Sequence, residues 1–419
     1  MASTTGPAPT GRAPSGRTPT GSGPLARVRQ HLDRPLASYQ LVLGSVSMLV
    51  GLGLIAVLSA SSVLSYYAYD GNSFAIVQRQ ATFAVLGIVG AWLATRVPIP
   101  VLRRLVLPAL VVSVLLMLAL FIPGVGITIN GNRNWLPIGF GQSVQPSEFA
   151  KLALILWIAD LYARRQHLMR RPRYILMPMI LVGFAVAGLV VLQDDLGTAL
   201  VLFCIILGML WVAGLPARYL GVLLAGLGVV CLYFVATAPY RVARMLNFLN
   251  PLADPDRDGY QSIQAMMGFA RGGIAGVGLG KSRQKWGSLP EAHTDFILAV
   301  IGEELGLLGT LVVLGLFLTL VIAGVRIALR TRQAFVRYAA AGITIWFAAQ
   351  TVINIGMVLG LLPVIGIPLP FLSYGGSSLI VTLLAAGLLL SFATTEPGAA
   401  AALRAGRARR RRRAAARRR

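Results

Sequence analysis

The amino-acid sequence predicts an all-α polytopic membrane protein of ten transmembrane helices, with a long extracytoplasmic loop between the seventh and eighth spans. Hydrophobic residues make up 56% of the 419 residues and charged residues only 12%, which excludes an ordinary soluble domain of this length. The apolar residues are gathered in runs of about 20, the length of a helix that crosses a bilayer. Arginines are concentrated in alternate connections between these runs, as in polytopic proteins with a fixed orientation.

The predicted spans divide the chain into two tails and one membrane domain. They lie at about residues 41–63, 77–95, 101–122, 148–163, 174–192, 198–215, 218–237, 296–325, 336–360 and 375–394. Residues 39–395 form the membrane domain, and its extracytoplasmic loop covers about residues 238–295. Most of the 38 basic residues fall in the tails and in the connections on the same side, which predicts that both termini are cytoplasmic.

Both tails are predicted to be disordered. Residues 1–38 are rich in Pro, Gly, Ser and Thr, and residues 396–419 end in a run that holds ten arginines after position 403. Such a run orients the chain and attracts anionic membrane lipids, and docking to a cytoplasmic protein is the alternative. Nucleic acid is not an expected partner, because no aromatic platform accompanies the arginines.

The first informative extracytoplasmic segment leads into the fourth span. It contains Arg133 and Trp135, and it ends with Glu148 and Lys151 three residues apart at the start of the span. Residues at this spacing share a helix face, so an ion pair is one interpretation. The other is that Lys151 is a cation facing a groove filled by substrate.

The second segment, about residues 238–295, is expected to be a long connection without regular structure, and loops of that length are usually functional. Its acidic run at 254–258 lacks the spacing of a calcium loop and is interpreted as a turn. The glycine-rich stretch from Arg271 to Lys281 is not a Walker loop. Its backbone N–H groups, exposed beside two cations, would suit a diphosphate.

Asp295 closes this loop where the eighth span begins. A carboxylate at that position is poorly solvated, which raises its pKa and makes it a better proton acceptor near neutral pH. The alternatives are that Asp295 caps the helix of the eighth span, or that it pairs with His293 or a nearby arginine. Glu303 and Glu304, further along the span, are expected to line the same cavity or to lock two helices together.

The third segment, residues 360–378, holds three prolines and several glycines that forbid a regular helix. Non-helical backbone near membrane depth is tolerated only against protein or a wet cavity. A re-entrant or interfacial lip is therefore predicted here.

At these segments the sequence resembles the SEDS family of bacterial cell-wall proteins, which includes FtsW, RodA and SpoVE. The resemblance covers about residues 40–395 and rests on two motifs. One is Asn-Ile-Gly-Met at 354–357 followed by Pro-Val-Ile-Gly-Ile-Pro-Leu-Pro-Phe-Leu-Ser-Tyr-Gly-Gly-Ser-Ser at 363–378. The other, at 278–285 with Leu-Pro-Glu-Ala-His-Thr-Asp-Phe-Ile at 289–297, is closest to FtsW. The family's usual Pro before Asp195 is replaced by Asp194, so no family role is assigned to Asp194.

The resemblance implies a glycosyltransferase of the bacterial plasma membrane that polymerises lipid II, the undecaprenyl-diphosphate-linked disaccharide-peptide, at the division septum. It implies a partner of the class B penicillin-binding type, an FtsI-like transpeptidase, among other division proteins. By position, Asp295 matches the family's essential aspartate and would be the general base of an inverting transfer. A non-enzymatic division scaffold and a lipid II flippase remain the alternatives, although the ionisable residues gather on one face, which does not suit a flippase.

The resemblance also suggests which residues contact the substrate. Five cations could hold the departing diphosphate: Arg133, Lys151, Arg241, Arg244 and Lys281. Trp135, Glu148, Gln261, His293 and Ser377 are the other residues expected to bind substrate. A divalent cation, Mg²⁺ or Mn²⁺, could accompany the diphosphate, but the sequence shows no dedicated cluster of metal ligands.

Overall fold

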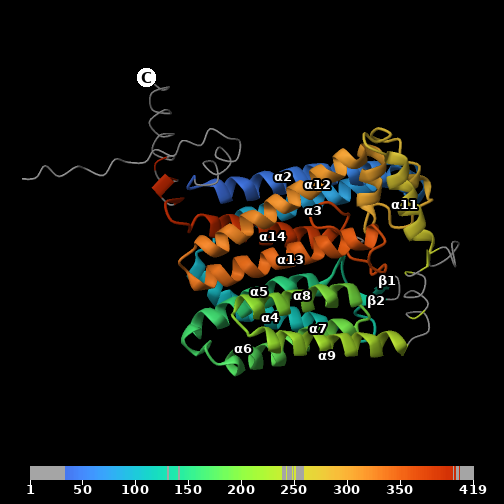
Figure 1. Cartoon of the computed structure of the whole chain (residues 1–419). Coiled ribbons are helices and arrows are strands. Elements are labelled where there is room, and N and C mark those ends of the chain that lie inside the picture. Colours follow the sequence, from blue (N-terminus) through green and yellow to red (C-terminus); the bar gives the residue numbers. More distant parts are fainter. Residues whose placement is uncertain are drawn as a thin grey trace, which may run out of the picture.

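The computed structural model describes residues 34–129, 132–139, 142–237 and 259–399, with single positions between 242 and 251 and after 400. The described chain is mostly helical, and its long helices run side by side in one bundle (Figure 1). Almost all of the two predicted tails lies outside the described residues, and so does the acidic run at 254–258.

Helices occupy all ten predicted apolar runs. They are α2 (Ala37–Ala68), α3 (Ala75–Ala94), α4 (Ile99–Ala119), α5 (Pro146–Arg164), α6 (Pro172–Pro178), α7 (Phe184–Leu192), α8 (Leu196–Val212), α9 (Ala217–Ala236), α12 (Ile297–Arg330), α13 (Ala334–Val358) and α14 (Gly376–Ala393). A π-helical turn, Met179–Gly183, joins α6 to α7. Within the described residues, seven helical runs are long and apolar enough to cross a membrane, and α8 and α9 are shorter apolar helices. This is a multi-pass membrane protein, and the count of ten spans stays a prediction.

Helix α13 lies at the centre of the bundle, between α5, α8 and α12. Small residues let its neighbours approach closely: a Cβ added at Gly342 would lie 2.6 Å from Ile155 Cγ2 of α5. Trp346 and Phe347, one turn further on, are fully buried. Helices α3, α4 and α9 instead expose rows of leucine and valine side chains, as expected of lipid-facing helices.

The all-α prediction is wrong for the segment that leads into α5. It forms a small antiparallel sheet of β1 (Ile127–Ile129), β2 (Asn132–Gly139) and β3 (Gln142–Val144), in that order. Backbone outside the helices still needs hydrogen-bond partners, and pairing these short strands supplies them. Gly139, with φ +91°, lies at the end of β2, where the chain turns toward β3.

The expectation of a structureless second segment is also wrong where the structure describes it. Residues Tyr260–Gly272 form helix α11, and Gln284–Trp286 form a 3-10 turn. Ala265, Gly268 and Gly272 recur at helical spacing, are buried, and pack α11 against α12.

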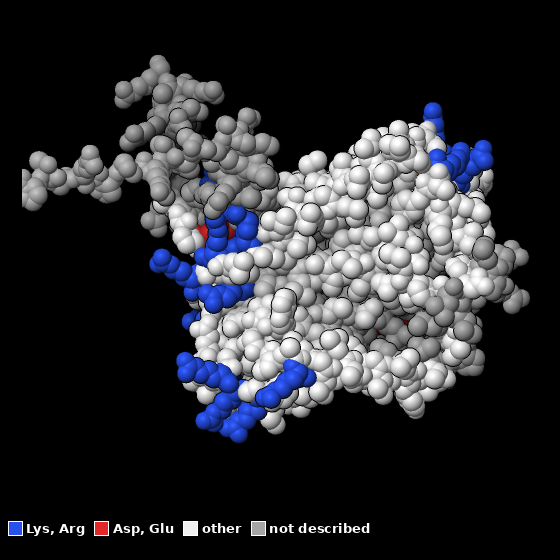
Figure 2. All heavy atoms as spheres, in the orientation of Figure 1, with Lys and Arg blue, Asp and Glu red and all other residues white. Residues whose placement is uncertain are grey.

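The bundle has two chemically different ends. We call the end that carries the sheet and α11 the loop end. Figure 2 shows that Lys and Arg side chains gather mainly at the opposite end, with a smaller group near α11. The surface is hollowed near β1 and β2, and acidic residues are visible inside the hollow (Figure 2). The charge asymmetry inferred from the sequence is therefore present in the folded molecule.

Candidate active site at the loop end

Asp295 is the last residue of the second segment, two residues before α12 begins, and its side chain is half-buried. The N-cap residue of α12 is Phe296, and no side-chain hydrogen bond caps the helix, so the alternative of a helix cap is wrong. Within the part of the chain that the structure describes, the Asp295 carboxylate has no ion-pair or hydrogen-bond partner. It is an uncompensated acid at a partly buried position.

The pKa of Asp295 is raised from 3.8 to about 7, first by burial and then by the charges of Glu291 and Asp195. Burial lowers the pKa of His293, against the opposing effect of Glu291. The neutral imidazole offers no counter-charge to Asp295. A carboxyl group with a pKa near 7 is suited to take a proton at neutral pH.

The third segment forms the predicted non-helical lip, residues 359–375, between α13 and α14. Its backbone carbonyls are satisfied by amide side chains from the neighbouring helices, which is how irregular backbone is tolerated at this depth. Asn354 Nδ2 donates to Ile367 O at 2.7 Å, Gln350 Nε2 to Pro368 O at 2.8 Å, and Gln80 Nε2 to Ser373 O at 3.0 Å.

Asn354 also fixes Asp295, because its Nδ2 donates to the backbone carbonyl of Asp295 at 2.8 Å. The lip leaves open space over the carboxylate at Gly366, which has φ +72°. A Cβ added at Gly366 would lie 3.5 Å from Asp295 Oδ2 and meet nothing else within 4 Å. A methyl group there would touch the carboxylate at van der Waals distance and fill the space beside it, and the positive φ would strain the backbone.

Asp195 joins the sheet to this region. Its Oδ1 accepts from the backbone N–H of Thr198 at 2.9 Å and so caps α8. Its Oδ2 accepts from Asn134 Nδ2 at 2.8 Å and from Gln145 Nε2 at 2.6 Å. Asp195 is not among the residues predicted for the site, although an Asp three residues before Thr198 at the start of an apolar run is an N-cap signal.

Glu148 and Lys151 form the predicted ion pair, at 2.7 Å, but both are buried inside the bundle. Lys151 Nζ also lies 5.1 Å from the ring centroid of Trp346. Trp346 Nε1 donates to Gln350 Oε1 at 2.7 Å. Trp346, Gln350 and Asn354 thus form a row at four-residue spacing on α13 that runs from Lys151 toward Asp295.

Other predicted residues lie around the loop end. Ser377 Oγ accepts from the backbone N–H of Gln145 at 3.2 Å, and Trp135 of β2 pairs with Ile127 of β1. Gln261 lies in the first turn of α11, and Lys281 is exposed on the loop that follows. Arg133 belongs to β2, but its side chain lies outside the described part of the chain, and so do Arg241 and Arg244.

The glycine-rich stretch does not present free N–H groups as expected. The N–H groups of Gly276, Val277 and Gly278 donate to the carbonyls of Gly272, Glu303 and Glu304 at 2.8, 3.0 and 3.0 Å. Arg271 Nη1 donates to Glu303 Oε1 at 2.9 Å. These groups serve the fold, and the interpretation of Glu303 and Glu304 as a lock between helices is confirmed.

Arg79 of α3 is a cation at the loop end that the sequence analysis missed. Its guanidinium donates to Tyr69 Oη at 2.9 Å and lies over that ring. It lines a hollow of about 350 Å³ between α3 and the sheet, together with Gln78, Thr82, Phe83, Ile138 and Gln142. The ring of Tyr374 in the lip packs against His293 in a tilted arrangement, with 5.5 Å between the ring centroids.

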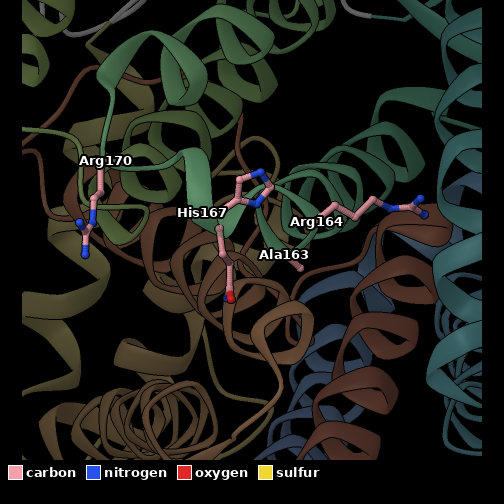
Figure 3. A pocket seen from close by; sticks show the side chains of 5 residues that line it. Ala163, Arg164, His167 and Arg170 are labelled. Carbon is pink, nitrogen blue, oxygen red and sulfur yellow. The ribbon is translucent and has the colours of Figure 1, made fainter.

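A larger hollow, about 680 Å³, lies at the opposite end of the bundle. Ala163, Arg164, Gln166, His167 and Arg170 line it. In Figure 3, Arg164 and Arg170 extend away from each other on either side of His167. Arg164 is paired with Asp160 at 2.7 Å. None of the predicted substrate-binding residues lines this hollow.

Comparisons with known sequences agree with this architecture. The chain matches the FtsW/RodA/SpoVE family, described as cell cycle proteins, over residues 39–397. It is 41% identical over 355 residues to the probable peptidoglycan glycosyltransferase FtsW of Mycobacterium tuberculosis, covering 85% of this chain and 67% of that protein. It is 41% identical over 334 residues to the stage V sporulation protein E of Bacillus subtilis, covering 79% and 90% of the two chains.

Solved structures share the fold. A structure described as "Structural coordination of polymerization and crosslinking by a peptidoglycan synthase complex" aligns with a TM-score of 0.68 at 32% identity, covering 84% of this chain and 97% of the other. RodA of Thermus thermophilus aligns with a TM-score of 0.62 at 28% identity, covering 85% and 97%. The chain therefore belongs to the FtsW/RodA/SpoVE family of cell cycle proteins.

Proposed function

We propose that this chain is a peptidoglycan glycosyltransferase that polymerises lipid II into glycan strands during septal cell-wall synthesis. The observation that carries the proposal is Asp295, a half-buried carboxylate with a pKa of about 7 and no partner among the described residues. The family relatives named as probable peptidoglycan glycosyltransferases support the reaction class.

Asp295 is the general base in this proposal. Its carboxylate takes the proton of the acceptor sugar 4-hydroxyl while that oxygen forms a bond to the anomeric carbon of the donor. The bond from the anomeric carbon to the diphosphate oxygen breaks, and undecaprenyl diphosphate leaves with the electron pair. Attack opposite the leaving group inverts the configuration at that carbon.

One free carboxylate is enough for this single displacement. Asp195, one of the two acids whose charges raise the pKa of Asp295, already accepts hydrogen bonds from Thr198, Asn134 and Gln145. These bonds make Asp195 a structural acid. A retaining mechanism would need a second carboxylate as nucleophile, whereas a diphosphate leaving group needs no acid.

The cations that stabilise the diphosphate remain part of the proposal. Arg133, Arg241, Arg244 and Lys281 are the candidates that the described contacts leave open. Lys151 is neutralised by Glu148, so we propose that it acts on the substrate only if that pair opens. Within the described residues no group of three His, Cys, Asp or Glu side chains could hold a metal ion. We therefore propose that any Mg²⁺ or Mn²⁺ is held mainly by the diphosphate oxygens.

We further propose ten spans, cytoplasmic termini and an extracytoplasmic loop end in the bacterial plasma membrane at the septum. The excess of basic side chains at the opposite end supports this orientation (Figure 2). An FtsI-like transpeptidase of the class B penicillin-binding type is the proposed partner, with other division proteins. The likeness to a chain of a peptidoglycan synthase complex supports a partner of this kind.

Purified protein with its transpeptidase, given lipid II in detergent, tests the proposal. Wild type should yield glycan polymer, and Asp295→Asn should yield at least about 100-fold less, since a positioned base contributes about 10²–10⁴ in rate. Polymer from Asp295→Asn at the wild-type rate would contradict the assignment of the base. No polymer from wild type would favour a flippase or a scaffold.

A further inference from the structure

Helix α12 is broken at Gly306, whose φ of 69° and ψ of −163° are not helical. The break divides α12 into a half-helix, residues 297–305, and a long remainder. Asp295 lies two residues before the half-helix. Because the helical hydrogen bonds are interrupted at Gly306, the position of the half-helix must be fixed by other contacts.

Residues 273–278 supply the backbone contacts at the break. The carbonyls of Glu303 and Glu304 accept from N–H groups of this segment, both at 3.0 Å. The N–H groups of Leu307 and Leu308 donate to its carbonyls at 2.9 and 3.2 Å. Four backbone groups next to the break are therefore paired outside the helix, which stabilises the broken conformation.

The approach of this segment to α12 depends on glycine. A Cβ at Gly272 would collide with the carbonyl oxygen of Gly302, and one at Gly276 would collide with that of Glu304. Gly276 also has φ +80°. The glycine-rich sequence is thus explained by backbone packing against the half-helix.

The Glu303 carboxylate fastens the half-helix to two further elements. It is fully buried and accepts from Arg271 Nη1 of α11 at 2.9 Å and from the Arg283 backbone N–H at 3.1 Å. It also accepts from the Ser282 hydroxyl. Hydrogen bonds to a charged group are stronger than those between neutral groups. Loss of one partner would leave the buried Glu303 charge poorly solvated, which costs stability.

We propose that Glu303 is a positioning residue: by binding Arg271 and the 282–284 turn, its carboxylate holds the half-helix, and with it Asp295, in the geometry of reaction. The inference rests on the proposed function of Asp295. Asn354 holds only the backbone carbonyl of Asp295, and Glu304 Oε1 accepts from Ser59 Oγ of α2 at 2.6 Å. The Glu303 carboxylate is the group that ties the half-helix to Arg271 of α11. Glu303 is about two turns from Asp295 and does not touch substrate in this account.

Steady-state polymerisation by Glu303→Gln tests the proposal. The variant keeps the size of the side chain and loses its charge. We expect kcat to fall at least about ten-fold with KM within about two-fold of wild type, because small displacements of a reacting group cost rate more than binding. Glu396→Gln, which also neutralises a buried glutamate but lies beyond α14, is the matched control and should retain the wild-type kcat.

Arg271→Gln provides a second variant if Glu303→Gln does not fold, because Arg271 is partly exposed and the Glu303 contacts to residues 282–284 remain. Arg271→Gln should lower kcat in the same way. Its effect should not add to that of Glu303→Gln, because both variants lose the same Arg271–Glu303 ion pair. Full additivity, or a wild-type kcat in either folded variant, would overturn the proposal.

Hydrogen exchange separates this inference from the function on which it rests. The N–H groups of residues 277, 278, 307 and 308 should exchange faster in both variants than in wild type, whether or not glycan is made. Unchanged exchange would show that the Glu303 contacts do not hold the half-helix in place, and would overturn the proposal. Faster exchange with unchanged kcat would overturn its positioning role. Inactive wild-type protein with faster exchange in the variants would instead contradict the proposed function.

Discussion

The raised pKa of Asp295 predicts a pH dependence that an ordinary aspartate would not produce. A general base acts in its ionised form. With a pKa of about 7, the ionised fraction of Asp295 is about 0.09 at pH 6 and about 0.9 at pH 8. The value of kcat/KM should therefore rise about ten-fold between these pH values. With the ordinary value of 3.8, the same group would be ionised throughout and the profile would be flat.

Glu291 offers a way to test the cause of this shift. Its charge raises the pKa of Asp295, so Glu291→Gln should move the rise in kcat/KM to lower pH. Asp70→Asn removes another acid at the loop end, from the exposed turn between α2 and α3, and should leave the profile unchanged. Asp70 has φ 49°, a conformation that asparagine also tolerates.

The assay is the initial rate of lipid II polymerisation by the detergent-purified complex at subsaturating substrate, from pH 5.5 to 8.5. A flat wild-type profile over pH 6–8 would refute the assignment of Asp295 as the titrating base. A rise that stays in place in Glu291→Gln would refute the contribution of the Glu291 charge and would leave burial and the charge of Asp195 as the causes of the shift.

Three further substitutions test the surroundings of Asp295. Gly366→Ala should cost about 1–2 kcal/mol of stability through its positive φ, and it should also lower activity because its methyl group fills the open space beside the Asp295 carboxylate. Gly214→Ala, with φ +88° and open space around it, should cost stability and leave activity unchanged; equal polymerisation rates in the two variants would contradict this role of the space at Gly366. Asn354→Leu leaves the backbone carbonyls of Asp295 and Ile367 without their hydrogen-bond donor. It should lower the free energy of unfolding, measured by denaturant titration, by about 1–3 kcal/mol for each carbonyl. The control Thr351→Val changes a hydroxyl without a partner in the described chain and should leave stability nearly unchanged. Lys151→Met should lower the free energy of unfolding by about 3–5 kcal/mol because it leaves Glu148 charged and buried. Adding Glu148→Gln should recover most of this stability, measured by thermal denaturation. No recovery would show that the ion pair matters for another reason.

The helices could be predicted from the sequence because each is an apolar run long enough for a membrane. The sheet could not, since β1 and β3 are three residues long and their pairing depends on contacts between segments. Helix α11 was missed for a different reason. Its buried face consists of Ala265, Gly268 and Gly272. A segment rich in such small residues has the composition of a loop, so its composition does not indicate a helix.

The candidate base could be predicted because Asp295 lies where a polar loop meets an apolar run and within a specific motif. Its supports could not. Asn354 reaches the Asp295 carbonyl across 59 positions of sequence, and Asp195 binds Asn134 across 61. Such contacts depend on which helices become neighbours in the fold. No local pattern in a single sequence shows which helices these are. Glu303 was noticed as an intramembrane acid, but its partners lie on two other elements.

The break at Gly306 also changes how α12 meets the bilayer. At 1.5 Å per residue, its 34 residues would make a straight rod of about 51 Å, whereas the hydrocarbon core is about 30 Å thick. The part after Gly306 is about 36 Å long, which is enough by itself to cross the core. The nine residues before it are not needed for that length. Their tilt can therefore follow contacts within the protein, and these contacts set the direction in which the half-helix carries Asp295.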